Sequence, residues 1–254
     1  TLVSMLIKSK ADVHVIMTEN ATKFIAPLTF ETLTGNKVHT NTFDLSPDHK
    51  VHHVTLVKDC DIFVIAPATA NIIAKIVHGI SDDMLSSTII ACHSLKMISP
   101  AMNTFMYENP INQDNLELCK KYGIKVIEPA SGRLACGDAG KWRIPETEYI
   151  LEEIIHEIAY KKDLINHKIL VTAGPTQEAI DPVRYITNHS TGKMGYAIAQ
   201  IASDRGAEVV LISGVVNLKA PNHVKLINVT SAKDMFDAVK KEVAELAQEG
   251  IKPC

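Results

Sequence analysis

The amino-acid sequence predicts an α/β fold, in which a doubly wound parallel sheet is followed by the start of a second α/β domain. Three observations support this prediction. Short apolar runs typical of buried parallel strands recur along the chain, and helical spacing follows each of them. The 254 residues are 46% hydrophobic, which is enough for ordinary buried cores. A polar stretch over residues 160–167 separates two such series and predicts a domain boundary.

The first series predicts a domain over residues 1–162, which begins in a helix already under way. Its strands are expected at residues 11–18, 61–66, 95–100 and 124–129. Its helices are expected at residues 21–34, 69–79, 112–122 and 146–161. Gly35 is a natural C-cap for the first of these helices. The last two strands each end in a proline, which cannot donate to a continuing ladder.

The second series predicts a domain over residues 163–254. Its strands are expected at residues 168–173, 208–213 and 225–229, and its helices at residues 192–205 and 231–248. Between the first strand and the first helix we expect a turn at residues 174–176 and then a loop as far as Ser190. Ser231 is a suitable N-cap for the last helix. We expect the first strand of the first domain and the C-terminal part of the second to lie outside this sequence.

Composition excludes several classes of protein. The net charge is −3 and only 22% of residues are charged, which gives no broad basic surface for nucleic acid or an anionic membrane. No apolar run approaches the ~20 residues that span a bilayer. The five cysteines are odd in number and form no C-x-x-C pair, which argues against a disulfide framework or a zinc site. We therefore expect a cytoplasmic protein that acts on small molecules.

Ligands bind doubly wound sheets at the carboxyl ends of the strands. Three motifs fall at or beside those ends in the first series: Ala66-Pro67-Ala68-Thr69-Ala70-Asn71, Ser99-Pro100-Ala101-Met102-Asn103-Thr104-Phe105-Met106 and Ser131-Gly132-Arg133-Leu134-Ala135-Cys136-Gly137-Asp138-Ala139-Gly140. A fourth motif, Val51-His52-His53-Val54-Thr55-Leu56, comes just before strand 61–66. Taken singly, each has an ordinary explanation: surface histidines, a capped strand-to-helix turn, an Asx turn, or a buried inert cysteine.

Each motif also has a chemical interpretation. Histidine titrates near neutrality, so His53 suits proton transfer. The small residues after strand 61–66 allow a flat ring or a phosphate to approach the backbone. The amide of Asn103 can donate to a carboxylate and accept from an amide N–H. Three glycines surround Cys136 in an expected loop, where a thiol could act as nucleophile or acid.

The second series carries one further constellation, built around the turn after strand 168–173 and the start of the following helix. It comprises Gly174-Pro175-Thr176-Gln177-Glu178, Asp181-Pro182-Val183-Arg184-Tyr185-Ile186 and Asn188-His189-Ser190-Thr191-Gly192-Lys193-Met194-Gly195. Glycines that open a helix after Ser and Thr suit a phosphate, and Lys193 would supply a counter-charge. The spacing fits neither a Walker A loop nor a G-x-G-x-x-G fingerprint. A capped helix without a ligand is the alternative.

Taken in order, the first four motifs closely resemble those of the flavin-dependent cysteine decarboxylases. The second constellation is similar to that of phosphopantothenate–cysteine ligases. The order of the two resembles the bacterial bifunctional enzymes of coenzyme A biosynthesis, over nearly the whole chain. The resemblance implies a Rossmann-like flavoprotein domain followed by the start of a Rossmann-like ligase domain.

The resemblance also implies two reactions. One is the FMN-dependent decarboxylation of 4′-phosphopantothenoylcysteine to 4′-phosphopantetheine, in which oxidation of the thiol-bearing carbon to a thioaldehyde creates a sink for the electrons that CO2 leaves behind. The other is the ligation of 4′-phosphopantothenate with cysteine, which uses CTP and Mg²⁺. Decarboxylases of this family assemble as trimers, often stacked into dodecamers, so we expect a homo-oligomer.

Residue roles follow from the same resemblance. His53 would be the base, Asn103 would hold the substrate's carboxylate and amide with Met106 and Arg143 beside it, and Cys136 would donate the last proton. The FMN-side candidates are Thr18, Pro67, Ala68, Thr69, Asn71, Ser87 and Thr88. The ligase candidates are Gly174, Arg184, Asn188, Ser190, Gly192, Lys193 and Gly195. No residue is expected to be a metal ligand.

The sequence departs from the family pattern in places that matter. Trp142 stands where the family has a glycine before the arginine of the cysteine loop, here Arg143. The family's glycine-rich turn for the flavin phosphate, and the ligase segment that grips CTP, are both absent from this sequence, so we expect an incomplete ligase. A peptidyl-cysteine decarboxylase and a non-catalytic flavin-binding regulator remain alternatives. The missing dinucleotide fingerprint disfavours an NAD dehydrogenase.

Overall fold

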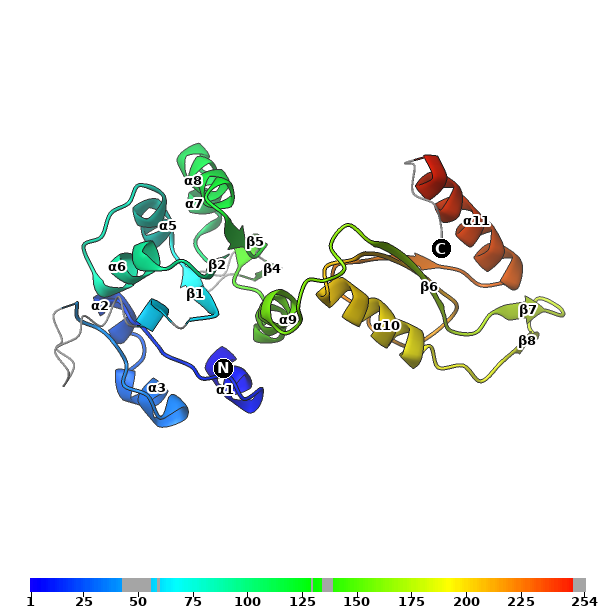
Figure 1. Cartoon of the computed structure of the whole chain (residues 1–254), viewed down its shortest axis with the longest axis horizontal. Helices are drawn as coiled ribbons and strands as arrows, with labels where there is room; N and C mark the ends of the chain where they lie inside the picture. Colours follow the sequence, from blue (N-terminus) through cyan, green and yellow to red (C-terminus); the bar gives the residue numbers. More distant parts are fainter. Residues whose placement is uncertain (43–55, 59, 129, 134–138, 249–254) are drawn as a thin grey trace. The chain divides into compact units, whose positions relative to one another are not determined.

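The computed structural model describes the chain except residues 43–55, 59, 129, 134–138 and 249–254. The chain divides into two compact units, Thr1–Ile154 and Ile155–Cys254 (Figure 1). The division falls inside helix α9 (Thr147–Ile158), because His156 Nδ1 lies 3.0 Å from Asp204 Oδ1 in the second unit. The predicted boundary between residues 162 and 163 lies slightly later and stays a prediction.

The first unit is built on a parallel sheet whose strands follow the predicted apolar runs. The strands are β1 (Ile62–Ala68), β2 (Leu95–Pro100) and β3 (Ile124–Val126), in the order β1-β2-β3. Their side chains alternate between two cores: Ile65 and Ile98 face one, and Val64 and Met97 face the other. A strand sequence that is apolar on both faces requires helices on both faces.

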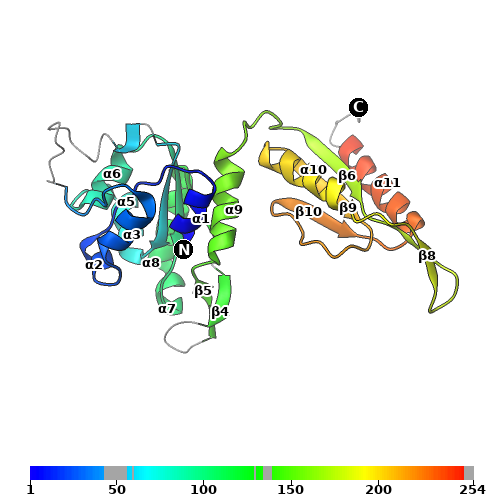
Figure 2. The same ribbon diagram turned by 90° about the horizontal axis from the view of Figure 1, so that it is seen from below.

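Helices cover both faces of this sheet, which is the doubly wound arrangement (Figure 2). One face packs against α5 (Ala70–Val77), α6 (Met84–Ala91) and α8 (Pro110–Lys121). The other face packs against α1 (Leu2–Lys8) and the first turns of α9, where Ile150 and Ile154 are buried. The predicted α/β fold of the first domain is confirmed.

The expected strand over residues 11–18 is wrong. The segment forms one isolated parallel bridge, from Ile16 to His39, and pairs with no other described strand. A ladder needs a partner along its length, and here only Met17 N and Val15 O exchange hydrogen bonds with His39. The helix expected after it is divided into α2 (Glu19–Thr22) and α3 (Pro27–Thr34).

Proline explains that division, and glycine explains the end of α3. Pro27 stands at the first position of α3, where its missing N–H costs nothing, and it holds Ala26 in an extended conformation. Gly35 ends the helix at φ 73°, in the left-handed region, as predicted.

An antiparallel hairpin replaces the loop that was expected at residues 131–140. It consists of β4 (Ala130–Arg133) and β5 (Ala139–Arg143), with Arg143 opposite Ala130. The short helix α7 (Thr104–Tyr107) lies against β5. The hairpin therefore brings the strand of Arg143 beside the segment that follows Asn103.

The second unit repeats the pattern with a parallel sheet and helices on both faces (Figures 1 and 2). Its sheet has the order β10 (Val224–Asn228), β9 (Glu208–Ser213), β6 (Lys168–Ala173). On one face α10 (Lys193–Asp204) buries Tyr196 and Ala199 against Val209 and Leu211. On the other lies α11 (Ala232–Gln248). The predicted strands and helices of this domain are confirmed within about two residues.

A second hairpin was not predicted. Strands β7 (Gln177–Ala179) and β8 (Tyr185–Thr187) pair antiparallel within the segment that was expected to be a loop. In Figure 1 the hairpin extends beyond the end of the sheet. Its strands are almost wholly exposed, so they carry no alternation of buried and exposed residues that could have revealed them.

Candidate functional site

The carboxyl ends of β1 and β2 form one edge of the first sheet. The backbone N–H of Ala101 donates to the carbonyl of Ala68 over 3.0 Å, which joins the two motifs that follow these strands. The Ala66–Pro67 peptide is cis, and Pro67 is exposed while Ala68 is fully buried. This edge therefore places the predicted FMN loop beside the predicted substrate segment.

Helix α5 starts directly at this edge. The hydroxyl of Thr69 caps the helix by accepting from Ile72 N at 3.5 Å, and Asn71 projects an exposed carboxamide from its first turn. Small side chains on both sides of Pro67 leave the backbone accessible, and the start of a helix favours an anion. Neutral hydroxyl and carboxamide groups at a helix start suit the phosphate and ring edges of FMN.

Asn103 follows β2 and is exposed. Its Oδ1 accepts from Phe105 N at 2.9 Å, which caps the single turn of α7, and its backbone carbonyl accepts from Tyr107 N at 2.9 Å. Among the described residues, no acceptor takes a hydrogen bond from the amide nitrogen of Asn103. We call residues 103–106 the clamp segment. It presents this amide nitrogen and the half-exposed side chain of Met106.

The remaining FMN-side candidates lie in different surroundings. Thr18 caps α2 by accepting from Ala21 N at 3.2 Å, and it is partly exposed. Ser87 is partly exposed and accepts from Ser81 Oγ at 2.9 Å. Thr88 is fully buried, and its hydroxyl donates to the carbonyl of Met84 at 2.5 Å. The Thr88 side chain thus supports α6 and offers no exposed surface to a ligand, contrary to the expectation.

Two of the predicted catalytic residues, His53 and Cys136, lie outside the described residues. Residues 134–138 connect β4 to β5, and β5 lies against α7. Arg143 and Trp142 belong to β5 itself, so the clamp segment and the strand of Arg143 are neighbours. Trp142 belongs to β5, at the place where the family has glycine.

Glycines surround the carboxyl end of β6 in the second sheet. Gly174 and Gly192 have φ of 76° and 74°, a conformation that L side chains rarely adopt. A Cβ on Gly192 would lie 3.4 Å from Gly174 Cα, and a Cβ on Gly195 would lie 2.5 Å from Ala173 Cβ. Three of the predicted ligase residues are therefore brought together where β6 ends and α10 begins.

Of the other ligase candidates, Asn188 and Ser190 lie in the segment just before α10, and Lys193 begins that helix. Asn188 Oδ1 accepts from Ser190 N at 2.9 Å, and Ser190 Oγ accepts from Gly192 N at 3.4 Å. Lys193 is exposed at the first position of the helix. Arg184 lies apart, between β7 and β8, where its guanidinium is 2.6 Å from Asp181 Oδ2. That hydrogen bond lowers the pKa of Asp181 below its usual range.

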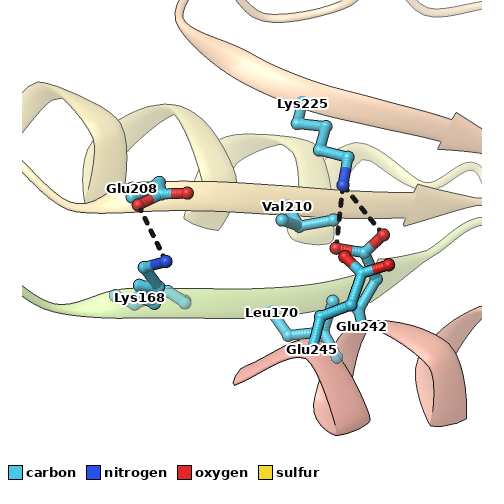
Figure 3. A pocket seen from close by; sticks show the side chains of 8 residues that line it. Lys168, Leu170, Glu208, Val210, Lys225, Glu242 and Glu245 are labelled. Atoms are coloured by element: carbon cyan, nitrogen blue, oxygen red, sulfur yellow. Dashed lines mark hydrogen bonds and ion pairs between the residues drawn. The ribbon is translucent and has the colours of Figure 1, made fainter. Parts of the chain in front are cut away.

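The opposite end of the second sheet holds an open depression of about 470 Å³ (Figure 3). Four of its charged side chains form two ion pairs: Lys168 lies 3.4 Å from Glu208, and Lys225 lies 2.9 and 3.0 Å from the two oxygens of Glu242 (Figure 3). Glu242 is buried, so this pair fastens α11 to β10. The depression lies at the amino ends of the strands, away from the glycine edge.

The comparisons with known proteins agree with the fold of both units. Residues 1–159 match the family model described as Flavoprotein. The chain belongs to the flavoprotein family. Residues 164–249 of this flavoprotein match the model of the DNA/pantothenate metabolism flavoprotein C-terminal domain.

Named relatives of the flavoprotein include the coenzyme A biosynthesis bifunctional protein CoaBC of Haemophilus influenzae, which is 44% identical over 93% of this chain. The chain spans 59% of the length of that relative. A PPC decarboxylase mutant complexed with pantothenoylaminoethenethiol has a similar structure, with a TM-score of 0.53 and 26% identity over 61% of this chain and 91% of that one. The FMN-binding protein AtHal3 has a TM-score of 0.51 and 27% identity over 61% of this chain and 89% of that one.

In the described part of the flavoprotein, no helix is long and apolar enough to cross a membrane. The same residues contain no group of three or more His, Cys, Asp or Glu side chains placed to hold a metal ion. The described cysteines are free thiols: Cys92 and Cys119 are buried and Cys60 is partly buried. Burial raises the pKa of Cys119 to about 11, which makes it a poor nucleophile.

Sequence reasoning missed several residues that shape these edges. Gly214 ends β9, and a Cβ there would lie 1.9 Å from the carbonyl oxygen of Pro175. The buried carboxamide of Asn112 and the neighbouring Gln113 contact the two ends of the clamp segment. A glycine after an apolar run signals the first of these. Carboxamides on an amphipathic helix give no signal, because they resemble a solvated face.

Proposed function

We propose that the first unit catalyses the FMN-dependent decarboxylation of 4′-phosphopantothenoylcysteine to 4′-phosphopantetheine. In the whole protein this activity would be joined to CTP- and Mg²⁺-dependent ligation of 4′-phosphopantothenate with cysteine. The observation that carries the proposal is the exposed amide nitrogen of Asn103. It lies at the same sheet edge as the predicted FMN loop, on the residue that caps α7, and α7 adjoins strand β5 of the β4–β5 hairpin.

FMN, when bound, supplies a two-electron acceptor for the thiol-bearing carbon of the substrate and later returns those electrons. Pro67, Thr69 and Asn71 would hold it at the start of α5, with Thr18 and Ser87 as further contacts. Asn103 would bind the substrate carboxylate through its amide nitrogen, and Met106 would pack on the substrate. This hydrogen bond would hold the carboxylate in the orientation from which CO2 leaves.

Proton transfers complete the proposed mechanism. His53 would remove a proton in the oxidation, and Cys136 would deliver the last proton after CO2 has left. The position of residues 134–138 between β4 and β5 supports this role, because β5 lies against the helix that Asn103 caps. Arg143, on the same strand, would supply positive charge for the substrate.

We propose a nucleotide site for the second unit. The paired glycines at φ 76° and 74°, the Ser190 hydroxyl and the exposed Lys193 suit a phosphate chain at the start of α10. In the whole protein, residues other than these would bind the CTP and Mg²⁺ of the ligation. We also propose a cytoplasmic homo-oligomer, a trimer or dodecamer. Exposed apolar side chains on the first unit, among them Phe24, Leu28 and Phe105, support it.

The test supplies 4′-phosphopantothenoylcysteine to the full-length, FMN-loaded protein and measures CO2 and 4′-phosphopantetheine. We expect both products in equal amounts. A yellow, FMN-loaded protein that releases neither would overturn the proposal. His53→Asn separates the remaining alternatives. Loss of turnover in this variant supports an enzyme, whereas a regulatory flavin-binding protein would show no turnover even as wild type. A peptidyl-cysteine decarboxylase would prefer a peptide ending in cysteine and stop at the enethiol.

A further inference from the structure

The clamp segment is held in place by two adjacent carboxamides of helix α8. Asn112 Nδ2 donates to Met102 Sδ at 3.2 Å, immediately before the segment. Gln113 Nε2 donates to the backbone carbonyl of Tyr107 at 2.6 Å, immediately after it. The residues that flank the clamp segment on both sides are therefore bonded to consecutive residues of one long helix.

The clamp segment needs such support. Helix α7 is a single turn of four residues, and an isolated helix of that length is not stable in water. The side chains of Asn103 and Met106 are exposed and contribute little burial of their own. Tyr107 is buried and fixes the end of the turn, while Met102 packs on the core of the first unit. The two carboxamides bond to these two anchors.

Asn112 shows that the arrangement has a cost to stability. The residue is only 5% exposed, and its Oδ1 has no hydrogen-bond partner in the described structure. A buried acceptor without a partner destabilises the fold, and leucine would fill nearly the same volume without that defect. The amide at this position therefore serves something other than stability of the core.

We propose that Asn112 and Gln113 are positioning residues that orient Asn103 toward the substrate. This inference rests on the proposed decarboxylase function. Asn112 is buried and Gln113 is partly exposed, and both act through the residues that flank the clamp segment. Removing either donor should let the turn of α7 open more often and should misalign the amide nitrogen of Asn103, with little effect on FMN binding.

The variants Asn112→Leu and Gln113→Met each remove one donor and keep the side-chain volume. Gln200→Met is the matched control, because Gln200 Nε2 makes a similar bond, 2.9 Å to Asp204 Oδ1, in the second unit. In the FMN-loaded full-length protein we expect kcat/KM to fall about tenfold for each α8 variant, equivalent to ~1.4 kcal/mol. The control should match wild type.

Two readouts separate positioning from a merely structural role. Thermal stability of Asn112→Leu should be equal to or above that of wild type while its turnover falls, because the unpaired acceptor is gone. Hydrogen exchange at the amides of Phe105 and Tyr107 should accelerate in both α8 variants and stay unchanged in Gln200→Met.

The outcomes are distinct. Unchanged exchange at Phe105 and Tyr107 overturns the positioning role even if the protein has another activity. Wild-type turnover in both α8 variants, with active wild-type protein, overturns it as well. Wild-type protein that forms no product, together with faster exchange in the variants, counts against the proposed function and leaves the mechanical link from α8 to α7 intact.

Discussion

The two sheets prepare their carboxyl ends for ligands in different ways. At the first edge, polar capping side chains are presented: Thr69 and Asn103 each cap the start of a helix and are exposed. At the second edge the side chains are absent, and Gly174, Gly192 and Gly195 let backbone approach backbone. One fold can thus offer selective polar groups for chemistry or a bare backbone for phosphates.

The difference predicts opposite sensitivities to substitution. Substitutions at the first edge should leave stability nearly unchanged but reduce activity, because its polar groups are exposed. Substitutions at the second edge should reduce stability first, because its glycines are packed against strands.

The largest expected effect is on the stability of the second unit. Gly214→Ala would place a Cβ 1.9 Å from the carbonyl oxygen of Pro175, a backbone atom that cannot move alone. We expect a loss of about 3 kcal/mol or more in the free energy of unfolding. Urea titration of wild type and variant measures it.

Gly35→Ala is the control for that substitution. Gly35 is at positive φ, unlike Gly214, and no atom of the described residues lies within 4 Å of the place that a Cβ would take. Only the cost of the left-handed conformation, about 1 kcal/mol, therefore remains. Equal losses in the two variants would show that the second edge is not tightly packed.

The next effect concerns activity at the first edge. Asn103→Leu removes the amide nitrogen that we assign to the substrate carboxylate, and a hydrogen bond to a charged group contributes about 1.5–3 kcal/mol. We expect kcat/KM for 4′-phosphopantothenoylcysteine to fall about 10–100-fold, while the free energy of unfolding changes by less than about 1 kcal/mol. Steady-state kinetics measure the change in kcat/KM, and urea titration measures the change in the free energy of unfolding. Wild-type kinetics of the Asn103→Leu variant would contradict the assignment of Asn103 to the substrate site.

A smaller effect is the acid sensitivity of the first unit. Burial raises the pKa of Asp83, but hydrogen bonds from Ser86 N and Lys75 outweigh it and hold the pKa below its usual range. A depressed folded-state pKa stabilises the fold above the unfolded value, and this stabilisation is lost as pH falls through the folded value. We expect wild type to lose its advantage over Asp83→Asn below about pH 4.

Measuring the free energy of unfolding of both proteins between neutral and acid pH checks this. A constant difference across that range would mean that the cap of α6 depends on shape alone. Asp234→Asn, at the start of α11, provides the corresponding measurement in the second unit, since hydrogen bonds from Ser231 also lower the pKa of Asp234.

The smallest expected effect concerns the reactivity of the Cys119 thiol. With a pKa of about 11, only about one in a thousand Cys119 thiols is ionised at pH 8. We expect iodoacetamide to leave Cys119 unmodified in the folded protein and to label it after unfolding, as peptide mass spectrometry would detect. Rapid labelling of Cys119 in the folded protein would contradict its burial in the core of the first unit.

Local patterns in the sequence were enough to predict most of the fold. Apolar runs located β1, β2, β6 and β9, and Gly35 located the end of α3. The strand expected at residues 11–18 failed because pairing depends on a partner that an apolar run does not reveal. The β7–β8 hairpin was not predicted for a different reason: its exposed residues show no alternation of apolar and polar side chains.

Of the candidate site, too, the sequence predicted one part and missed another. The sequence motifs located Asn103 and Pro67, which the fold brings to one edge through Ala101 and Ala68. His53 and Cys136 lie outside the described residues, so their roles stay predictions. Asn112 and Gln113 escaped notice because their importance comes from what α8 packs against, which only tertiary structure can tell.

The central claim is the proposal that the first unit catalyses the decarboxylation of 4′-phosphopantothenoylcysteine and that Cys136 supplies only the last proton. The most direct test mixes FMN-loaded, full-length Cys136→Ser with 4′-phosphopantothenoylcysteine under anaerobic conditions and follows CO2 and flavin absorbance. We expect about one CO2 per protomer, an enethiol product and a flavin that stays bleached. Return of the flavin colour with a normal yield of 4′-phosphopantetheine would contradict the claim.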